Sequence, residues 1–414
     1  MILYLFRILF LILTISTVFL SFSRNLDVFS PVKIYLVFNI FFYLDVYISE
    51  YSVYVCVVYL FQCLIIFFFV YFEKEPKSNM TTSIDFPVRI VNVIWLLSFV
   101  SIFNQVYIII ELGGVVNYIG NIAFRVEYFK GKGYIIVLNN LIAIMNVMYF
   151  TVIIASKKLT FKQRILFCIH FICFVCVALL SGSRSFLLMT VLVEILIFHY
   201  ISKRFSMVKL TPFILVILFL VALLGGLRNS VNTTDGEITV RNDGEVKMEV
   251  THFKYGLIPL EIIFNSTEVV NYHLGKTYFS FFTNFVPRSI YPEKLDSGGI
   301  VFTKEYTGDQ WGGLSNLATG SVTEGIINFG YSFGVIVGVC FLIFFMFVGV
   351  RVYNNINAII MGGKCVFLLP LYIYLVLSFA RLSYSEFSYT FYTYVIYYLV
   401  PIMVVYYFAK LKIR

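Results

Sequence analysis

Carboxylates and histidines in one polar interval of this sequence are its first candidates for acid–base chemistry. The interval runs from Arg228 to about Gly325 and holds no apolar run of the roughly 17–25 residues that cross a bilayer. Its acidic and imidazole candidates are Glu324, His273, Glu305, Asp309 and His252. Glu324 lies where the interval gives way to an apolar stretch, so partial burial would raise its pKa toward that of a general base. The alternative for each candidate is a solvated loop side chain.

Arginines form the second group of candidates. Arg184 lies in a SerGlySerArgSer turn between two apolar segments, where a guanidinium and the unpaired N–H groups of the next helix could bind a phosphate. An ordinary interfacial arginine at a helix hairpin fits the same residues. The topology argued below places further arginines on the same side of the membrane, namely Arg125, Arg228, Arg288 and Arg381. Their convergence favours an anionic ligand that arrives in the lipid, such as a lipid-linked pyrophosphate.

Several common catalytic motifs are absent from the sequence. It contains no AspXxxAsp pair, no GxxxxGK[ST] phosphate loop, no GxSxG elbow and no HExxH. Chemistry in this chain is therefore expected to use an already activated lipid substrate without a metal or another cofactor. All seven cysteines lie in or beside apolar segments, which predicts neither a disulfide framework nor a thiolate metal cluster. The CxxC pair Cys173 and Cys176 is interpreted as two small buried thiols on one helix.

Composition indicates an all-α polytopic integral membrane protein. Hydrophobic residues make up 60% of the chain and charged residues 13%, whereas soluble domains carry about 25% charged residues. The net charge of +9 is spread over connecting loops. This is the positive-inside pattern of a membrane protein, and it argues against nucleic-acid binding.

The apolar segments predict about eleven membrane-spanning helices, within a range of ten to twelve. We place them at 3–22, 32–49, 52–72, 90–110, 134–155, 165–180, 186–202, 210–227, 326–350, 365–382 and 391–409. The chain is thus expected to consist of an N-terminal block 1–227 with about eight spans, one large extracytoplasmic loop 228–325, and a C-terminal block 326–414 with about three spans.

Basic loops set the predicted orientation. The segments 157–164 and 203–205, Arg351 and the C-terminal tail are compact and basic, and placing them all in the cytoplasm is self-consistent. The outward elements are then the segment 111–133, the turn 181–185, the long loop and the turn 381–386. The N-terminal end stays open, because an odd number of spans puts Met1 outside whereas Arg7 favours the cytoplasm.

Two acids lie within the apolar segments, Asp45 and Glu194. Intramembrane acids are often functional. Asp45 is near the end of its span, whereas Glu194 could pair with a basic group on a neighbouring helix. No internal repeat or matched pair of broken helices is visible, which argues against an inverted-repeat transporter.

The pattern as a whole resembles a known family. The resemblance rests on SerGlySerArgSer at 181–185, on GlyGly…AsnTyr…Arg125…GlyLysGlyTyr, and on a large loop with ProArg…TyrPro…GlyGly…GluGlyXxxXxxAsnPheGly. These features, together with the architecture of the whole chain, are similar to the O-antigen and capsule repeat-unit polymerases (Wzy). The motifs are short and degenerate, so topology carries much of the resemblance.

The resemblance implies a glycosyl transfer on the outer face of the cytoplasmic (inner) membrane, in a helical scaffold similar to the GT-C glycosyltransferases. A growing glycan would pass from undecaprenyl pyrophosphate to the non-reducing end of a new lipid-linked repeat unit, with inversion at the anomeric carbon. It also implies pathway partners, namely a chain-length regulator and a flippase. Lipopolysaccharide or capsule would be the product.

The chain contains residues of the types that this reaction needs. Arg184 and Arg288 would stabilise the leaving pyrophosphate without a metal, with Arg228, Arg381 and Arg125 as further binding residues. Glu324, in preference to His273, would accept the proton of the acceptor hydroxyl. Trp311 and Tyr306 could stack on sugar faces or could belong to the core of the loop.

Other functions remain open at this level. An O-antigen ligase shares scaffold and donor and differs in its acceptor, and a peptidoglycan-type polymerase is a further variant. A flippase of the same lipid-linked sugar predicts short, even loops and a charged central cavity, which the long loop and the two mid-span acids do not favour. A purely structural membrane protein accounts for the spans and leaves the loop unexplained.

Overall fold

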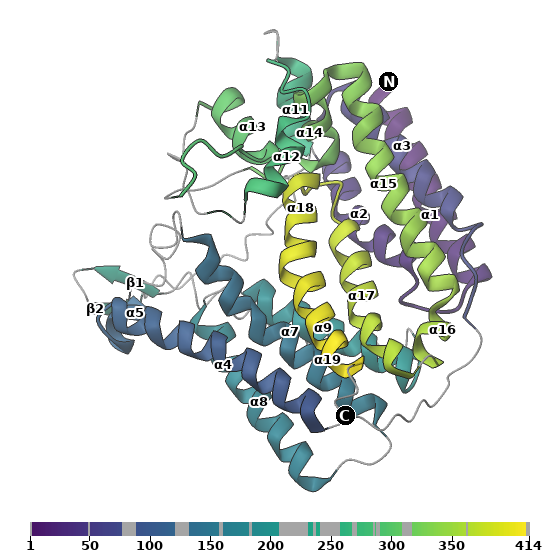
Figure 1. Ribbon diagram of the computed structural model, residues 1–414. Coiled ribbons are helices and arrows are strands. Elements are labelled where there is room, and N and C mark those ends of the chain that lie inside the picture. Colours follow the sequence, from purple (N-terminus) through teal and green to yellow (C-terminus); the bar gives the residue numbers. More distant parts are fainter. Residues whose placement is uncertain are drawn as a thin grey trace. The chain divides into compact units, whose positions relative to one another are not determined.

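The computed structural model describes residues 2–48, 50–76, 88–120, 132–156, 160–181, 184–206, 231–234, 237–240, 257–266, 271–284, 286, 290–308, 317–361 and 363–410 (Figure 1). Helices dominate this part of the chain. Six of the described helices are long and apolar enough to cross a membrane, at Ile2–Arg24, Arg89–Glu111, Gly133–Ala155, Phe161–Leu180, Tyr331–Asn354 and Phe387–Phe408. Shorter apolar helices lie at Pro31–Ile40, Val53–Phe69, Phe186–Ile201 and Cys365–Phe379. The protein is therefore a multi-pass α-helical membrane protein.

The chain divides into two compact units. Unit 1 comprises Met1–Lys77, His252–Asn357 and Tyr372–Val395. Unit 2 comprises Ser78–Thr251, Ala358–Leu371 and Ile396–Arg414. Each unit thus combines segments that are far apart in the sequence.

Four long helices form the frame of unit 1. They are α1 (Ile2–Arg24), α2 (Pro31–Ile48), α3 (Val53–Phe69) and α15 (Tyr331–Asn354). Helix α1 packs against α2 and α3, and α15 packs against the same two helices; α1, α3 and α15 run side by side in Figure 1. Because these helices are apolar on nearly every face, the sequence pattern specifies spans and leaves the choice of neighbours to side-chain packing.

Shorter helices of unit 1 come mainly from the polar interval. They are α11 (Leu257–Asn265), α12 (Lys276–Thr283), α13 (Gly298–Tyr306), α14 (Gly320–Phe329) and, after the turn at 381–386, α18 (Phe387–Thr393). Helix α12 packs against α13, α14 and α18, and α14 also packs along α15. The interval predicted as one loop therefore contributes a packed group of short helices to unit 1.

The predicted span 326–350 begins too early. Helix α14 ends at Phe329, and Gly330 separates it from α15 with a φ of 79°, a left-handed conformation that glycine adopts without a steric penalty. The spanning helix accordingly starts at Tyr331. Hydropathy alone misses this boundary because both sides of Gly330 are apolar.

Unit 2 is built on α4 (Val88–Glu111), α7 (Gly133–Ala155), α8 (Phe161–Leu180) and α9 (Arg184–Ile201), with α19 (Val400–Lys410) against α4 and α7. Helix α8 begins where it does because Thr160 and Gln163 form a capping box. Unit 2 also contains α5 (Val115–Gly120), most of α16 (Ile356–Met361) and η2 (Gly363–Phe367). A short antiparallel hairpin of β1 (Val231–Thr234) and β2 (Glu237–Val240), in which Val231 pairs with Val240, belongs to the same unit.

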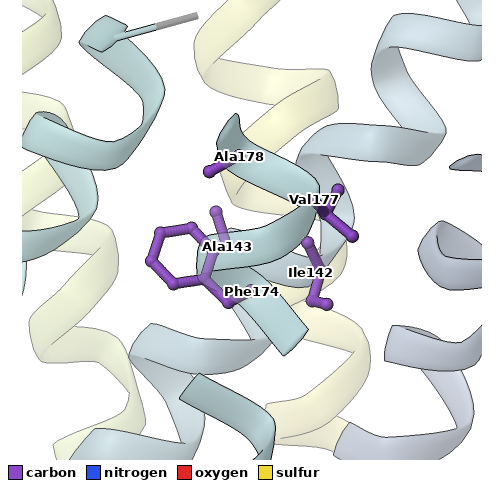
Figure 2. Close-up of a cluster of buried hydrophobic side chains, with 5 residues drawn as sticks. All are labelled: Ile142, Ala143, Phe174, Val177 and Ala178. Atoms are coloured by element: carbon purple, nitrogen blue, oxygen red, sulfur yellow. The ribbon is translucent and has the colours of Figure 1, made fainter. Parts of the chain in front are cut away.

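Figure 2 shows part of the apolar core of unit 2. Ile142 and Ala143 on α7 meet Phe174, Val177 and Ala178 on α8, and all five side chains are buried. Their van der Waals contacts hold the two helices together. The layer also bounds a polar network that lies one helical turn away.

The other predicted spans have mixed outcomes. Segments 3–22, 90–110, 134–155 and 165–180 each match one candidate span. The segments 32–49, 52–72 and 186–202 match shorter apolar helices, while 365–382 becomes η2 followed by α17 (Leu368–Phe379). The final span extends from α18 through a π-helical turn, η3 (Tyr394–Leu399), into α19. Segment 210–227 lies outside the described residues, so the count of about eleven stays a prediction.

Candidate functional site

Glu324 lies on the inner side of the short-helix group of unit 1. It is on α14 and has no solvent exposure. Its Oε1 accepts a hydrogen bond from Thr277 Oγ1 of α12 at 3.0 Å, and its Oε2 accepts one from the backbone N–H of Ser388 at 3.2 Å. Asn328, one turn further on, donates to both Thr277 Oγ1 (2.6 Å) and the Glu324 carbonyl (2.8 Å). The carboxylate thus joins α12, α14 and the start of α18.

A second buried carboxylate, Glu386, lies beside Glu324. Glu386 is the N-cap residue of α18 and is 8% exposed. Two adjacent glycines at the start of α13 leave room for the pair. A Cβ on Gly298 would meet Glu324 Cγ at 2.7 Å, and one on Gly299 would collide with Oε2 of Glu386. The SerGlyGly sequence at 297–299 therefore lets the N-terminus of one helix approach both acids closely.

Helix N-termini explain how the site tolerates two acids. Glu324 accepts from the first turn of α18, and Glu386 faces Ser297 and the backbone of Gly299 at the start of α13. The partial positive charge and free N–H groups of a helix N-terminus favour an anion. Each carboxylate is thereby placed against a different helix end.

Burial still makes the charged forms costly. Burial raises the pKa of Glu324, and the hydrogen bonds from Ser388, Thr277 and Phe387 oppose that rise. Burial, and then the negative charge of Glu324, raise the pKa of Glu386 to about 8. Because the charge of one carboxylate disfavours ionisation of the other, the two carboxyl groups do not ionise independently. Two adjacent carboxyl groups that do not ionise together can supply a proton donor and a proton acceptor at one site.

The pair should make stability depend on pH. A carboxyl with a raised folded-state pKa binds its proton more tightly in the folded protein than in the unfolded chain, so stability is greatest at low pH. For Glu386 alone, stability is expected to fall between about pH 4.3, the unfolded value, and about pH 8, by up to about 1.4 kcal/mol per pH unit. We expect Glu386→Gln to flatten this dependence and to be more stable than wild type near pH 8. Thermal unfolding of wild type and Glu386→Gln in detergent, at several pH values across this range, measures the pH dependence of stability.

Glu293→Gln is the matched control for that experiment. Glu293 is an exposed glutamate of the same polar interval, and its removal should leave the pH dependence as in wild type. Equal slopes for wild type and Glu386→Gln would show that Glu386 is ionised in the folded protein throughout the range.

The turn 381–386 brings an arginine to the same region. The backbone N–H of Ser321 at the start of α14 donates to the Leu382 carbonyl at 2.9 Å, which anchors the turn to the helix that carries Glu324. The Nε of Arg381 is buried and has no hydrogen-bond partner among the residues that the structure describes. The phenol of Tyr389, a residue that is 49% exposed, lies within electrostatic range of both Arg381 and Glu386.

Several buried polar atoms on the elements that carry Glu324, Glu386 and Arg381, or that pack against them, have no hydrogen-bond partner among the described residues. Such an atom costs about 1–3 kcal/mol when it stays unsatisfied, so a folded protein has few of them unless a ligand or water meets them. Besides Arg381 Nε, these atoms include Ser280 Oγ, Thr319 Oγ1, Ser383 Oγ and Glu386 Oε2. They offer hydroxyl, carboxyl and guanidinium groups to a polar ligand.

His273 and Glu305 pair with each other. His273 Nε2 and Glu305 Oε1 are 2.8 Å apart, and both side chains are partly exposed. The backbone N–H of His273 also donates to the Ile327 carbonyl of α14 at 3.1 Å. His273 thus lies near the end of the helix that carries Glu324, with its imidazole turned to Glu305. Tyr306 stacks on Phe302 with ring centroids 5.3 Å apart.

Other predicted site residues fall beyond what the structure describes. Arg184 is the first residue of α9, in unit 2, and its side chain lies outside the described part. Those wholly outside the described residues are Arg125, Arg228, Arg288, His252, Asp309 and Trp311. Sequence reasoning missed Glu386, Thr277 and Ser388. A usable signal was the SerGlyGly run, because two adjacent glycines at a helix start allow close approach of another chain segment.

Comparisons of the chain with known protein families, curated proteins and solved structures find no match. Fold and site together define a class: a multi-pass α-helical membrane protein with two buried, adjacent glutamates in one of its two units.

Proposed function

We propose that the protein is a metal-independent glycosyltransferase of the O-antigen or capsule polymerase type. It would transfer a growing glycan from undecaprenyl pyrophosphate to a new lipid-linked repeat unit at the outer face of the cytoplasmic membrane. The observation that best supports this is the grouping in unit 1 of a buried acid pair, Glu324 and Glu386, with Arg381 on the adjoining turn. Such a transfer needs a base for the acceptor and a cation for the leaving group.

In this proposal Glu324 is the base. The acceptor hydroxyl gives its proton to the Glu324 carboxylate while its oxygen bonds to the anomeric carbon. The bond from that carbon to the pyrophosphate oxygen breaks, and its electron pair leaves with undecaprenyl pyrophosphate. A base acts within about 2.6–3.2 Å of the proton that it takes. Since Glu324 is fully buried, the cover formed by α13 and the 381–386 turn has to open for the acceptor.

Arg381 and Glu386 would bind the leaving pyrophosphate through hydrogen bonds. The unpaired Nε of Arg381 can donate to a phosphate oxygen. A protonated Glu386 carries no charge that would repel the pyrophosphate, and its Oε2 has no hydrogen-bond partner among the described residues. Protonated, that oxygen can donate to a second phosphate oxygen. The donor-binding roles of Arg184, Arg288, Arg228 and Arg125 stay predictions from the sequence.

The test is complementation of a strain that lacks this protein. We expect wild type to restore a ladder of surface glycan, and Glu324→Gln or Arg381→Ala to leave a single repeat on its carrier. Loss of a general base or of a charge-stabilising donor slows a reaction by roughly 100-fold or more. The same assay applies to Arg184→Ala and Arg288→Ala. Membrane expression of each variant must equal that of wild type.

Glu293→Gln and Arg351→Ala are matched controls, because both side chains are exposed and neither belongs to the proposed site. Both should restore a full ladder. If the strain without the protein already makes long polymer that stays on the lipid carrier, polymerisation occurs elsewhere. That result would overturn the polymerase proposal. The protein would then be a ligase that transfers the finished glycan to another acceptor, or a transporter of the lipid-linked glycan.

A further inference from the structure

Four buried polar side chains in unit 2 form one chain of hydrogen bonds. Ser98, Asn146, His170 and Glu194 come from α4, α7, α8 and α9, and their exposures are 0%, 0%, 0% and 7%. His170 Nε2 lies 2.7 Å from Ser98 Oγ, and His170 Nδ1 lies 2.9 Å from Asn146 Oδ1. Asn146 Nδ2 donates to Glu194 Oε1 at 2.6 Å. The basic partner that the sequence suggests for Glu194 is therefore His170, with Asn146 between them.

Counting donors fixes the protons of this chain. The hydroxyl of Ser98 donates to the Ile94 carbonyl at 2.8 Å, and that carbonyl is an acceptor only. Since a serine hydroxyl has a single proton, Nε2 of His170 has to donate to Ser98 Oγ. Asn146 Oδ1 is also only an acceptor, so Nδ1 of His170 has to donate as well. With the amide in this orientation, His170 is a cation and Glu194 is the anion that balances it.

Turning the Asn146 amide over gives a second arrangement on the same atoms. The amide NH₂ then donates to Nδ1 of a neutral His170, and a protonated Glu194 donates to the amide oxygen. Every contact is again a hydrogen bond. In passing from the first arrangement to the second, the Nδ1–H bond of His170 is broken and an O–H bond forms on Glu194. Both arrangements are neutral overall and both hold one proton.

Any other proton count breaks the chain. With no proton, Glu194 is an uncompensated anion among apolar helices; with two, His170 is an uncompensated cation. A buried charge without a partner costs several kcal/mol. We propose that Ser98, Asn146, His170 and Glu194 form an intramembrane proton-binding site that holds one proton, on His170 or on Glu194. This site is independent of the proposed transfer reaction, which we place in unit 1.

The surroundings keep water from supplying other partners. The rings of Trp95 and Tyr149 stand edge-on to His170, with centroids 5.0 and 5.5 Å away. One turn along α7 and α8 lies the apolar layer with Ile142 and Phe174 (Figure 2). On the opposite side the Tyr149 hydroxyl donates to the Gln163 carbonyl at 3.4 Å. The network is thus bounded by apolar side chains on the side of Ile142 and Phe174 and by the phenol of Tyr149 on the opposite side.

Titratable groups of the neighbouring helices lie further out. Among the described groups outside the network, Tyr149 is the one that adjoins it. The others with described side chains are Arg89, Tyr107 and Glu111 on α4, Tyr134 on α7, Lys162, Arg164, Cys168, Cys173 and Cys176 on α8, His199 and Tyr200 on α9, and Tyr406 and Tyr407 on α19. Glu111 forms its ion pair with Lys132, just before α7, at 3.1 Å.

The proton count can be measured on full-length wild-type protein in liposomes. Solid-state NMR with ¹⁵N-labelled histidine shows whether His170 has one or two N–H groups, and infrared spectroscopy with ¹³C-labelled glutamate shows whether Glu194 is a carboxylic acid. His199 supplies a second buried histidine signal for comparison, and its Nδ1 accepts from the Phe205 N–H at 2.9 Å. The range from about pH 6 to pH 8 brackets an ordinary histidine.

We expect one proton throughout that range. His170 should be doubly protonated with Glu194 ionised, or singly protonated with Glu194 a carboxylic acid, or a mixture whose two fractions add to one. Glu194→Gln should give a singly protonated His170 and remove the Glu194 signal, whereas Glu111→Gln should change neither. A neutral His170 beside an ionised Glu194, or a cationic His170 beside a protonated Glu194, would overturn the proposal without any variant.

Discussion

Adding one methyl group at Gly334 is expected to push α14 away from α15 and to destabilise unit 1 by about 3 kcal/mol or more. The two helices touch through their backbones at three glycines. A Cβ on Gly334 would collide with the Gly325 carbonyl, and a Cβ on Gly325 would collide with the Gly334 carbonyl. A Cβ on Gly338 would lie 2.5 Å from the Ser321 carbonyl oxygen. Backbone atoms on both sides leave no flexible side chain that could move aside.

Membrane helices associate through such small residues because lipid provides no hydrophobic force between them. Gly334 and Gly338 stand four residues apart on one face of α15, the spacing that lets two helix backbones come together. Losing the contact would also move Glu324, since it lies on α14 next to Gly325. Gly334→Ala is therefore expected to lower both stability and the transfer activity proposed for this unit.

Gly349→Ala provides the comparison on the same helix. A Cβ at Gly349 would lie 3.5 Å from Val376 Cγ2, an ordinary van der Waals distance. Alanine also favours a helix over glycine by about 0.5–1 kcal/mol, so this variant should be neutral or slightly stabilising. Unfolding of both variants in the same detergent measures the difference. If Gly334→Ala unfolds like Gly349→Ala, the close approach of α14 and α15 is not a feature of the folded protein.

Long spans are the part of this fold that sequence predicts well. The segment predicted at 134–155 is α7 at Gly133–Ala155, and that at 90–110 is α4 at Val88–Glu111, because twenty apolar residues have one stable structure in lipid. The break at Gly330 was not predictable in this way. It depends on one backbone angle, and the apolar residues on either side look like a single span.

The site was partly predictable for a similar reason. Hydropathy places Glu324 at the edge of an apolar stretch, and the structure buries it completely. Its neighbour Glu386 comes from a distant turn, and nothing local in the sequence shows that the two acids meet. Their proximity depends on how α13, α14 and α18 pack, which is a property of tertiary structure. The role of Glu324 as a base remains a prediction.

The largest loss of stability from a single charge is expected at Lys33. Its side chain is 4% exposed, and its Nζ donates to the carbonyls of Asn25 at 2.5 Å and Asp27 at 2.7 Å. Two buried acids lie beside it. Asp27 accepts from the Tyr353 hydroxyl at 2.7 Å, and Glu73 accepts from Asn25 Nδ2 at 2.9 Å. The network links four parts of unit 1. Asn25 and Asp27 lie in the turn after α1, Lys33 is in the first turn of α2, Glu73 follows α3, and Tyr353 is near the end of α15.

Lys33→Met keeps an unbranched side chain that is one atom shorter, and it removes the charge and the three donors of the ammonium group. Two backbone carbonyls then lose a partner, and Asp27 and Glu73 lose the cation that offsets their charge. Burial raises the pKa of Glu73, and the charge of Lys33 opposes that rise, so the variant should also make Glu73 easier to protonate. Removing one partner of a buried charge network typically costs about 3–5 kcal/mol, and we expect a loss of that size in detergent unfolding.

Lys74→Met is the control, because Lys74 is exposed close to the same network and its removal should cost less than about 1 kcal/mol. A double variant separates charge from packing. If the cost of Lys33→Met comes from an unbalanced carboxylate, then Glu73→Gln made in the same chain should recover part of it, because a neutral amide needs no cation. If the two losses simply add, Lys33 acts on the carbonyls of Asn25 and Asp27 alone. A loss no larger than that of Lys74→Met would mean that the buried ammonium does not hold this end of unit 1 together.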